Sequence, residues 1–270
     1  MKGLEFYKLN ASGNDFIIID NRDGVIYKLC KDVPDFVSRV CRQHLSVGAD
    51  GLILIENSDK ADFKWRFFNS DGSEAEMCGN GGRCVARYAY IKGIAESEMS
   101  FETKAGIIKA QVSSSKVKIQ LTDPKELRLD YPLRFDDTEI FISSVNTGVP
   151  HAVLISDDIE RIPVDEIGRK IRYHSVFGTQ GTNVNFVQII DEGNVKIRTY
   201  ERGVEGETFA CGTGAVATGV ILKEKGLVNT PVKIWTKGGE IINIYLEEHV
   251  YLEGESRVVF RGELFEEALL

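Results

Sequence analysis

Two cysteines, each followed by glycine, are the residues of this chain best suited to acid–base chemistry. One begins the run Cys78-Gly79-Asn80-Gly81, and the other begins Cys211-Gly212-Thr213-Gly214. A helical apolar pattern follows each run, so we expect each thiol at a helix N-terminus, where unpaired N–H groups and the helix dipole lower the thiol pKa. The glycines let a ligand approach the backbone, whose N–H groups suit a carboxylate. Each turn therefore offers both a base and an anion site.

Other roles fit these two cysteines less well. Most free cysteines are small buried hydrophobes, and we expect that role for Cys30, Cys41 and Cys84. The chain has no Cys-x-x-Cys pair and its four histidines are scattered, which argues against a metal site. A cysteine protease would need only one nucleophile. The sequence therefore predicts thiol chemistry with neither a metal nor a cofactor.

A pair of similar thiols suits the inversion of a stereocentre. Inversion removes a proton from one face of a carbon and delivers a proton to the opposite face, so a thiolate takes and a thiol gives. Backbone N–H groups at two helix N-termini would stabilise the negative charge that develops beside a carboxylate. We therefore expect Cys78 and Cys211 to face each other across a cleft and to act on one small amino-acid substrate.

An internal repeat supports this pairing. Gly48-Ala49-Asp50 recurs as Gly181-Thr182-Asn183, and the Cys-Gly-x-Gly run of Cys78 recurs at Cys211, both 133 residues later. Gly13-Asn14-Asp15-Phe16 matches Gly148-Val149-Pro150-His151 more loosely, at an offset of 135. Two matches at one offset, the first before a predicted strand and the second opening a helical pattern, indicate a duplicated fold.

The elements that must position the thiols are mostly strands. Apolar runs rich in β-branched and aromatic residues predict strands over 16–20, 52–56, 63–69, 106–121, 152–155, 186–190, 196–201 and 233–246. Helical periodicity predicts helices over 34–45, 78–93, 164–174 and 211–225. The sequence thus predicts an α/β (α+β) fold with two pseudo-symmetric domains, each a curved, mostly antiparallel sheet wrapped around a central helix. We expect the domains to comprise residues 1–123 with about 256–270, and residues 124–255.

Composition limits the setting in which this chemistry takes place. The net charge of −8 comes from interspersed acidic and basic residues, which argues against nucleic acid and anionic membranes as partners. No apolar run reaches the roughly 20 residues that span a bilayer, and the start lacks the apolar segment of a signal peptide. We therefore expect a cytoplasmic protein with reduced thiols.

Several motifs together resemble those of the diaminopimelate epimerase family. The motifs are Ser12-Gly13-Asn14-Asp15-Phe16, Phe68-Asn69-Ser70-Asp71-Gly72-Ser73, Met77-Cys78-Gly79-Asn80-Gly81-Gly82-Arg83-Cys84, Gly148-Val149-Pro150-His151, Thr182-Asn183, Tyr200-Glu201-Arg202-Gly203 and Ala210-Cys211-Gly212-Thr213-Gly214. The resemblance runs from Lys8 to near the C-terminus. It implies interconversion of LL- and meso-diaminopimelate without pyridoxal phosphate, in lysine and peptidoglycan precursor synthesis, and a homodimer.

The resemblance also implies roles for individual residues. Cys78 and Cys211 would be the two acid–base groups, and His151 would be a neighbour that tunes a thiol. The reacting end of the substrate would meet Asn14, Gly79, Asn80, Gly212 and Thr213, with its carboxylate held largely by backbone N–H groups. The distal end would meet Asn69, Asn183, Glu201 and Arg202, where the guanidinium can grip a carboxylate in a fork.

Two departures from the family pattern concern substrate recognition and leave the thiols untouched. Val149 stands where the family commonly has an Asn that binds the distal carboxylate, and Gly51 stands where Gln is frequent. One alternative is therefore a racemase of another amino acid, such as histidine, with the same two-cysteine mechanism. A second alternative is a non-catalytic protein that clamps an amino acid between two domains.

Overall fold

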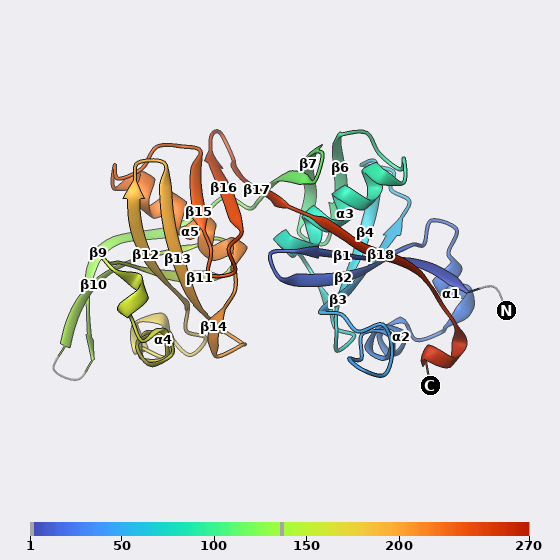
Figure 1. Ribbon diagram of the computed structural model, residues 1–270, viewed down its shortest axis with the longest axis horizontal. Helices are drawn as coiled ribbons and strands as arrows, with labels where there is room; N and C mark the ends of the chain where they lie inside the picture. Colours follow the sequence, from blue (N-terminus) through green and yellow to red (C-terminus); the bar gives the residue numbers. More distant parts are fainter. Residues whose placement is uncertain (1–2, 136–137, 270) are drawn as a thin grey trace. The chain divides into compact units, whose positions relative to one another are not determined.

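The computed structural model describes residues 3–135 and 138–269, which form two compact units (Figure 1). Unit 1 comprises Met1–Ile119 with Glu255–Leu270, and unit 2 comprises Gln120–Gly254. The ends of the first expected domain, residues 1–2 and 270, lie outside the described residues. In the part of the chain described, no helix is both long and apolar enough to cross a membrane.

Unit 1 is a mixed sheet whose strands run in the order β18-β1-β2-β3-β4-β6-β7-β8. The pairs β2–β3 and β4–β6 are parallel and the other pairs are antiparallel. The last strand, dark red in Figure 1, runs along the first, in blue. The strands are β1 (Leu4–Ala11), β2 (Asn14–Asp20), β3 (Gly51–Glu56), β4 (Phe63–Asn69), β5 (Glu74–Ala75), β6 (Glu98–Thr103), β7 (Gly106–Ser113), β8 (Lys116–Gln120) and β18 (Arg257–Leu264).

Unit 2 repeats this arrangement strand for strand, in the order β9-β10-β11-β12-β13-β15-β16-β17. Its parallel pairs, β11–β12 and β13–β15, occupy the same places in the order as those of unit 1. The strands are β9 (Lys125–Phe135), β10 (Thr138–Asn146), β11 (Pro150–Ile155), β12 (Asn183–Asp191), β13 (Asn194–Glu201), β14 (Gly206–Thr208), β15 (Val232–Trp235), β16 (Ile241–Leu246) and β17 (Val250–Glu255).

One 13-residue helix packs against the sheet in each unit. Helix α3 (Gly79–Ile91) contacts β1, β2 and β7, and α5 (Gly212–Glu224) contacts β10, β11 and β16, which are the equivalent strands. A second helix lies beside β4 in unit 1 (α2, Val33–Val40) and beside β13 in unit 2 (α4, Val164–Arg172). The predicted fold class, with mostly antiparallel sheets and a helix in each, is confirmed.

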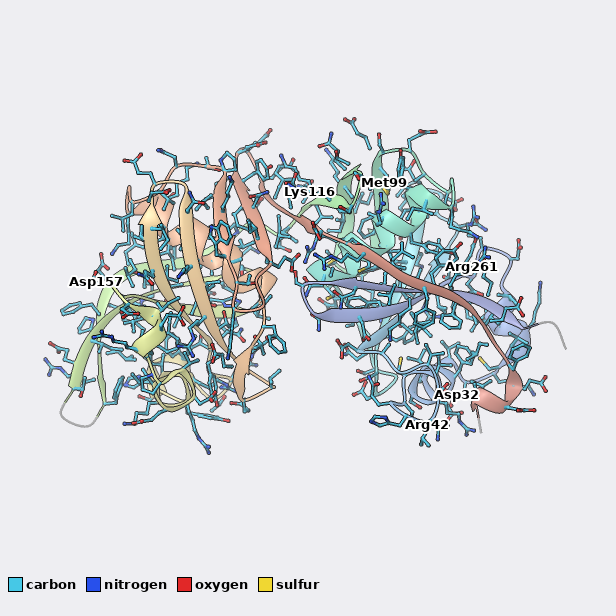
Figure 2. The ribbon with its side chains drawn as sticks, viewed as in Figure 1. Asp32, Arg42, Met99, Lys116, Asp157 and Arg261 are labelled. Carbon is cyan, nitrogen blue, oxygen red and sulfur yellow. The ribbon has the colours of Figure 1, made fainter. Side chains whose placement is uncertain are left out.

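Local signals explain where these helices begin. Asp32, labelled in Figure 2, precedes α2 and accepts a hydrogen bond from the backbone N–H of Asp35 at 3.1 Å. Pro34 follows within the first turn, where its missing N–H costs nothing. Helix α4 instead carries its acidic residues in the first turn and its basic residues in the last, which complements the helix dipole.

Three predicted elements are wrong in extent. The strand expected over 106–121 is two strands, β7 and β8, because the chain turns at Ser114, whose φ is +56°. The strand expected over 233–246 divides into β15 and β16 around Gly239, which also has a positive φ. The helix expected over 34–45 ends at Val40, and a short helix α1 (Val25–Leu29) precedes it.

Candidate active site

Both cysteines lie at the start of their helices, as the sequence predicts. Cys78 is the N-cap of α3 with an extended backbone, and its sulfur accepts a hydrogen bond from the N–H of Gly81 at 3.4 Å. Cys211 is the N-cap of α5, also extended, and its sulfur lies 3.5 Å from Thr213 Oγ1. The first N–H groups of a helix have no partner within it, so the backbone of Gly79, Asn80, Gly212 and Thr213 faces the same end as each sulfur.

In unit 1 the side chains of Asn14 and Asn80 meet beside Cys78. Asn80 Nδ2 donates to Asn14 Oδ1 at 2.6 Å, and Asn14 Nδ2 donates to Asp50 Oδ2 at 3.1 Å. Arg83 lies fully buried beneath them and donates to Asn80 Oδ1 at 2.7 Å and to the Glu255 carbonyl at 3.0 Å. Two of the expected substrate contacts are therefore held in place by a buried guanidinium one turn further along α3.

The expectation of a lowered thiol pKa is wrong for Cys211. Burial and the nearby carboxylate of Glu201 raise the pKa of this thiol to about 11, although Thr213 and backbone N–H groups act in the opposite direction. Cys211 is only 9% exposed as a residue, and desolvation disfavours the thiolate more than one helix N-terminus favours it. Cys211 is therefore a thiol at neutral pH in this structure.

His151 lies fully buried on β11, next to Thr213. Its Nε2 is 2.9 Å from Thr213 Oγ1, and its Nδ1 is 3.1 Å from Asn185 Nδ2. Burial, together with the charge of Arg202, lowers the pKa of His151 to about 3, so the ring is neutral. The side chain of Thr213 thus connects the imidazole to the sulfur of Cys211.

The residues expected at the distal end of the substrate differ in how the fold uses them. Asn183 is buried, donates to the Pro150 carbonyl at 3.1 Å and accepts from the Arg202 N–H at 2.8 Å, so its amide fixes the main chain beside Arg202. Burial raises the pKa of Glu201, and a hydrogen bond from Thr208 opposes that shift. Asn69 ends β4 and donates to Ser73 Oγ at 3.0 Å, a contact within its own turn.

The hairpin that leads into each cysteine carries the same ion-pair network. Arg66 donates through Nε and Nη2 to the two carboxylate oxygens of Glu74, at 2.9 and 3.1 Å. Arg198 grips Glu207 in the same way, at 2.6 and 2.8 Å. A lysine completes each network, with Lys104 on Glu74 at 2.9 Å and Lys237 on Glu207 at 2.6 Å. The two glutamates precede Cys78 and Cys211 by four residues each, so both hairpins are anchored alike.

The remaining cysteines and one family departure have structural explanations. Cys41 and Cys84 are buried as predicted, whereas Cys30 is only partly buried. Burial raises the pKa of Cys41 to about 12, which makes it unreactive. At Gly51, an added Cβ would lie 2.6 Å from the Phe68 carbonyl oxygen, so β3 and β4 approach too closely for a larger residue at this position. Val149 lies half-buried in the loop before β11.

Sequence reasoning missed two buried polar residues beside the site. Asn185 is fully buried in β12, and Arg83 is fully buried in α3. A signal for the first was available, because Asn185 interrupts the apolar run from Val184 to Val187. A polar residue inside a buried strand needs hydrogen-bond partners, and such residues mark functional networks.

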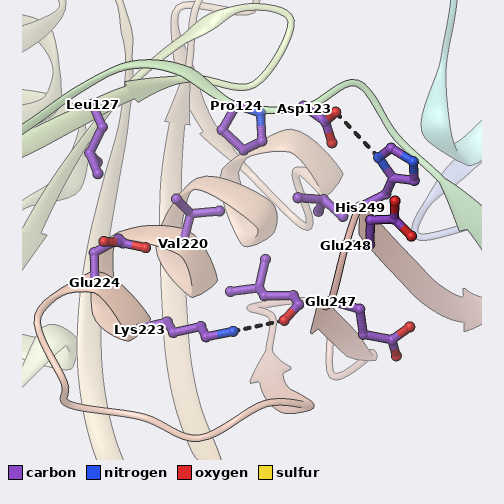
Figure 3. Close-up of a pocket in the computed structure, with 11 residues that line it drawn as sticks. Asp123, Pro124, Leu127, Val220, Lys223, Glu224, Glu247, Glu248 and His249 are labelled. Atoms are coloured by element: carbon purple, nitrogen blue, oxygen red, sulfur yellow. Dashed lines mark hydrogen bonds and ion pairs between the residues drawn. The ribbon is translucent and has the colours of Figure 1, made fainter.

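A pocket elsewhere in unit 2 involves different residues (Figure 3). It encloses about 360 Å³ between the end of α5 and the β16–β17 turn. Dashed contacts in Figure 3 join His249 to Asp123 at 3.3 Å and Lys223 to the Leu246 carbonyl at 2.7 Å. Neither cysteine motif lines this pocket, so it is separate from the candidate site within this unit.

Solved structures of two other proteins share the fold of this chain. A *Bacillus anthracis* phenazine biosynthesis protein of the PhzF family matches 98% of this chain and 100% of its own, with a TM-score of 0.71 and 15% identity. A hydroxyproline epimerase from *Agrobacterium vitis*, solved with bound trans-4-OH-L-proline, matches 99% of this chain and 94% of its own, with a TM-score of 0.70 and 16% identity. At these identities the likeness establishes the fold.

Sequence comparison establishes the family. A family model described as diaminopimelate epimerase matches residues 6–126 and 143–259. The diaminopimelate epimerase of *Aquifex aeolicus* (strain VF5) is 50% identical, covering 98% of this chain and 99% of the relative. That of *Archaeoglobus fulgidus* is 41% identical, covering 96% of this chain and 95% of the relative. With both cysteine motifs inside the matched residues, the chain belongs to the diaminopimelate epimerase family of isomerases.

Proposed function

We propose that this protein is a diaminopimelate epimerase that interconverts LL- and meso-diaminopimelate. The proposal rests chiefly on one observation: in a chain of this family, a cysteine caps each of two equivalent helices in a duplicated fold. Removing the α-proton and returning one to the opposite face requires one acid–base group for each face. Cys78 and Cys211 are those groups in this proposal. Small-molecule isomerisation of this kind belongs in the cytoplasm, in the synthesis of lysine and peptidoglycan precursors.

The protonation state of Cys211 favours this residue as the first proton donor. Because burial and Glu201 raise the pKa of Cys211 to about 11, it holds a proton before substrate binds. The complementary step needs Cys78 to take the α-proton. After one turnover the roles are exchanged, and the reverse reaction regenerates the starting state. N–H groups of Gly79 and Gly212 at the two helix starts would stabilise the charge on the reacting carboxylate.

The binding residues divide between the two ends of the substrate. In this proposal Asn80 and Thr213 offer backbone N–H groups to the reacting carboxylate, and Asn14 meets the reacting amino group, a role supported by its hydrogen bond with Asn80 beside Cys78. At the distal end, Arg202 grips the second carboxylate and Glu201 meets the second amino group, while Asn69 contributes its amide. The contacts of Asn183 favour a supporting role, because its side chain fixes the backbone of Arg202.

A turnover experiment in deuterated water tests this proposal. Purified protein is incubated with LL-diaminopimelate and, separately, with a panel of L-amino acids that includes histidine. We expect meso-diaminopimelate to form with deuterium at the inverted α-carbon, and no exchange in the panel. Turnover of one panel amino acid without turnover of diaminopimelate would establish a different racemase. Binding of diaminopimelate without deuterium incorporation would establish a non-catalytic binding protein.

We also infer a homodimer. Strand β18 at the edge of the unit 1 sheet exposes three neighbouring apolar residues, Val258, Val259 and Phe260, and the last is 45% exposed. Exposed apolar edge strands are surfaces that proteins usually cover. Light scattering coupled to size exclusion should give a mass near 60 kDa, twice the 30.1 kDa of one chain. A mass of one chain at micromolar concentration would contradict the inference.

A further inference from the structure

A row of polar side chains lies under the helix that begins at Cys211, and it has no counterpart under the helix that begins at Cys78. The row consists of His151, Asn185 and Thr199, one from each of β11, β12 and β13, and all three are buried. The strand registers assign the equivalent positions in unit 1. Asn185 pairs with Thr199 and Val153, as Ile53 pairs with Phe67 and Ile18.

The unit 1 positions are apolar throughout. Phe16 is equivalent to His151. His151 lies two residues before Val153, which pairs with Asn185, and Phe16 lies two residues before Ile18, which pairs with Ile53. Phe16, Ile53 and Phe67 are buried, and the two rings contact edge to face with centroids 5.9 Å apart. The helix position above each row is a glycine. An added Cβ would lie 3.4 Å from Ile53 at Gly81 and 2.3 Å from Asn185 Oδ1 at Gly214. Asn185 therefore packs directly against the first turn of α5.

The hydrogen bonds of Asn185 fix the orientation of its amide. Nδ2 lies 3.0 Å from the Ala152 carbonyl oxygen, which can only accept, so this atom must be the amide nitrogen. Oδ1 in turn accepts from the Thr199 hydroxyl at 3.0 Å. The second hydrogen of Nδ2 points to His151 Nδ1 at 3.1 Å. His151 Nδ1 is consequently an acceptor and carries no proton.

This orientation decides which imidazole nitrogen carries the proton. A neutral imidazole has one N–H, and with Nδ1 accepting, the proton lies on Nε2. Nε2–H then donates to Thr213 Oγ1 at 2.9 Å. That bond uses a lone pair of the Thr213 hydroxyl and leaves its hydrogen for the sulfur of Cys211, 3.5 Å away. The lowered pKa of His151 is consistent with a neutral ring.

We propose that Asn185 is a positioning residue, which fixes the His151 tautomer so that Thr213 donates its hydroxyl hydrogen to Cys211 and stabilises the thiolate. The proposal rests on the proposed function, in which Cys211 gives up and regains a proton. Cys211 starts as a thiol, so the donor matters at the moment when the sulfur becomes charged. Unit 1 has no such chain in the described residues, because Phe16, Ile53 and Phe67 carry no polar atoms in their side chains.

The charged groups that face this network act alongside it. Glu201 on β13 disfavours the Cys211 thiolate, and Arg202, next along the chain, disfavours a protonated His151. Neither residue belongs to the hydrogen-bond chain, and both remain in the variants described next. A change in the alkylation midpoint of Cys211 can then be assigned to the hydrogen bonds among Asn185, His151 and Thr213.

Alkylation of Cys211 as a function of pH tests the proposal without requiring epimerase activity. The full-length protein is pulsed with iodoacetamide between pH 7 and 12, and modification of the Cys211 peptide is quantified by mass spectrometry, with Cys78 as the internal reference. We expect Asn185→Ile, which introduces the residue found in unit 1, and Thr213→Val each to raise the alkylation midpoint of Cys211 by about one pH unit, tenfold in thiolate population. Thr213→Ser retains the hydroxyl and should keep the wild-type midpoint.

A midpoint unchanged in either Asn185→Ile or Thr213→Val, with circular dichroism showing a folded protein, would overturn the proposal. The tautomer gives a second test, since ¹⁵N chemical shifts distinguish protonated from unprotonated imidazole nitrogens. We expect His151 to carry its proton on Nε2 in the wild type, with the signal assigned by its loss in His151→Gln. A proton on Nδ1, or on both nitrogens at pH 8, would also overturn it. Failure of the wild type to turn over diaminopimelate would contradict the proposed function while leaving both measurements interpretable.

Discussion

The two cysteine-capped helices are built alike and differ in what lies beneath them. Both are 13 residues long, both follow a hairpin held by an Arg–Glu–Lys network, and both begin at an extended cysteine. Under α3 the sheet presents Phe16, Ile53 and Phe67, whereas under α5 it presents His151, Asn185 and Thr199. The duplicated backbone sets where each sulfur lies, and the side chains below set which hydrogen bonds the sulfur receives.

Removal of either sulfur has the largest expected effect. Cys78→Ala and Cys211→Ala should each lower epimerase turnover by roughly 10²- to 10⁴-fold, because each removes one of the two acid–base groups. Chiral chromatography of the LL and meso isomers gives the rate. Cys41→Ala is the matched control, since this thiol lies in the core beside α2 and should leave turnover within about twofold of the wild type. Full turnover in Cys211→Ala would exclude the two-base mechanism.

Replacing each of the two equivalent helix glycines with alanine should change the stability of the protein by different amounts in the two units. Gly214→Ala would place its Cβ 2.3 Å from Asn185 Oδ1, so it should destabilise the protein by about 1–3 kcal/mol. Gly81→Ala makes ordinary contacts with Ile53, Cys78 and Trp65, and it should be neutral or stabilising by up to about 1 kcal/mol. Urea unfolding measures both. Equal effects at the two positions would show that the layers under the helices do not differ in packing.

Acid should destabilise the protein partly through protonation of His151. The equivalent residue in unit 1, Phe16, cannot be protonated. The folded pKa of His151 is about 3, below the ordinary value near 6.5, so the unfolded chain binds the proton first. This contribution to stability is complete above pH 6.5 and is lost as the pH falls toward 3, amounting to about 2 kcal/mol between pH 7 and pH 5. Unfolding free energies at several pH values should show a shallower slope in His151→Gln. An identical slope would mean that His151 becomes protonated in the folded state.

The duplicated ion pairs should give the smallest effect and a graded one. Glu207 is less exposed than Glu74, at 9% against 21% for the side chains, so we expect Glu207→Gln to cost about 1–2 kcal/mol and Glu74→Gln about 1 kcal/mol or less. Hydrogen bonds from Arg66 and Lys104 lower the pKa of Glu74. For Glu207, burial opposes the lowering, but the bonds from Arg198 and Lys237 outweigh it. The stabilisation is therefore present above the ordinary carboxyl pKa and is lost as the pH falls below it, so variant and wild-type unfolding curves should converge in acid. A constant difference at all pH values would contradict a charge-based effect.

Much of the fold could be predicted because its signals are local. The two central helices were predicted over 78–93 and 211–225 and extend over Gly79–Ile91 and Gly212–Glu224, since glycine-rich starts and apolar periodicity define them. The break between β15 and β16 was also encoded locally, at Gly238-Gly239, and was overlooked. Strand β9 also carries a local signal that the prediction missed, because apolar and polar residues alternate from Leu127 to Phe135, although its first six positions are exposed.

The candidate site likewise has features that neighbouring residues encode and features that depend on tertiary contacts. Residue types and spacing identified both cysteines and their glycines, because a helix start is defined by a few neighbouring residues. The raised pKa of Cys211 was not predictable, since it depends on how much water the packed sheet excludes and on a carboxylate ten residues away. Asn185 has a local signal in the apolar run that it interrupts, but the partners of Asn185 and Arg83 come from distant parts of the chain and could not be predicted.

The sequence by itself determined that this chain is duplicated, that each half opens a helix with a cysteine, and that the chemistry suited to such a pair is proton exchange at a carbon. Those properties depend on residues adjacent in the chain. Tertiary structure alone decided that His151, Asn185 and Thr213 form one hydrogen-bond chain ending at the sulfur of Cys211, and that Phe16 and Ile53 take the corresponding places in the other half. Strand register brings these residues together, and register depends on packing between segments far apart in the sequence.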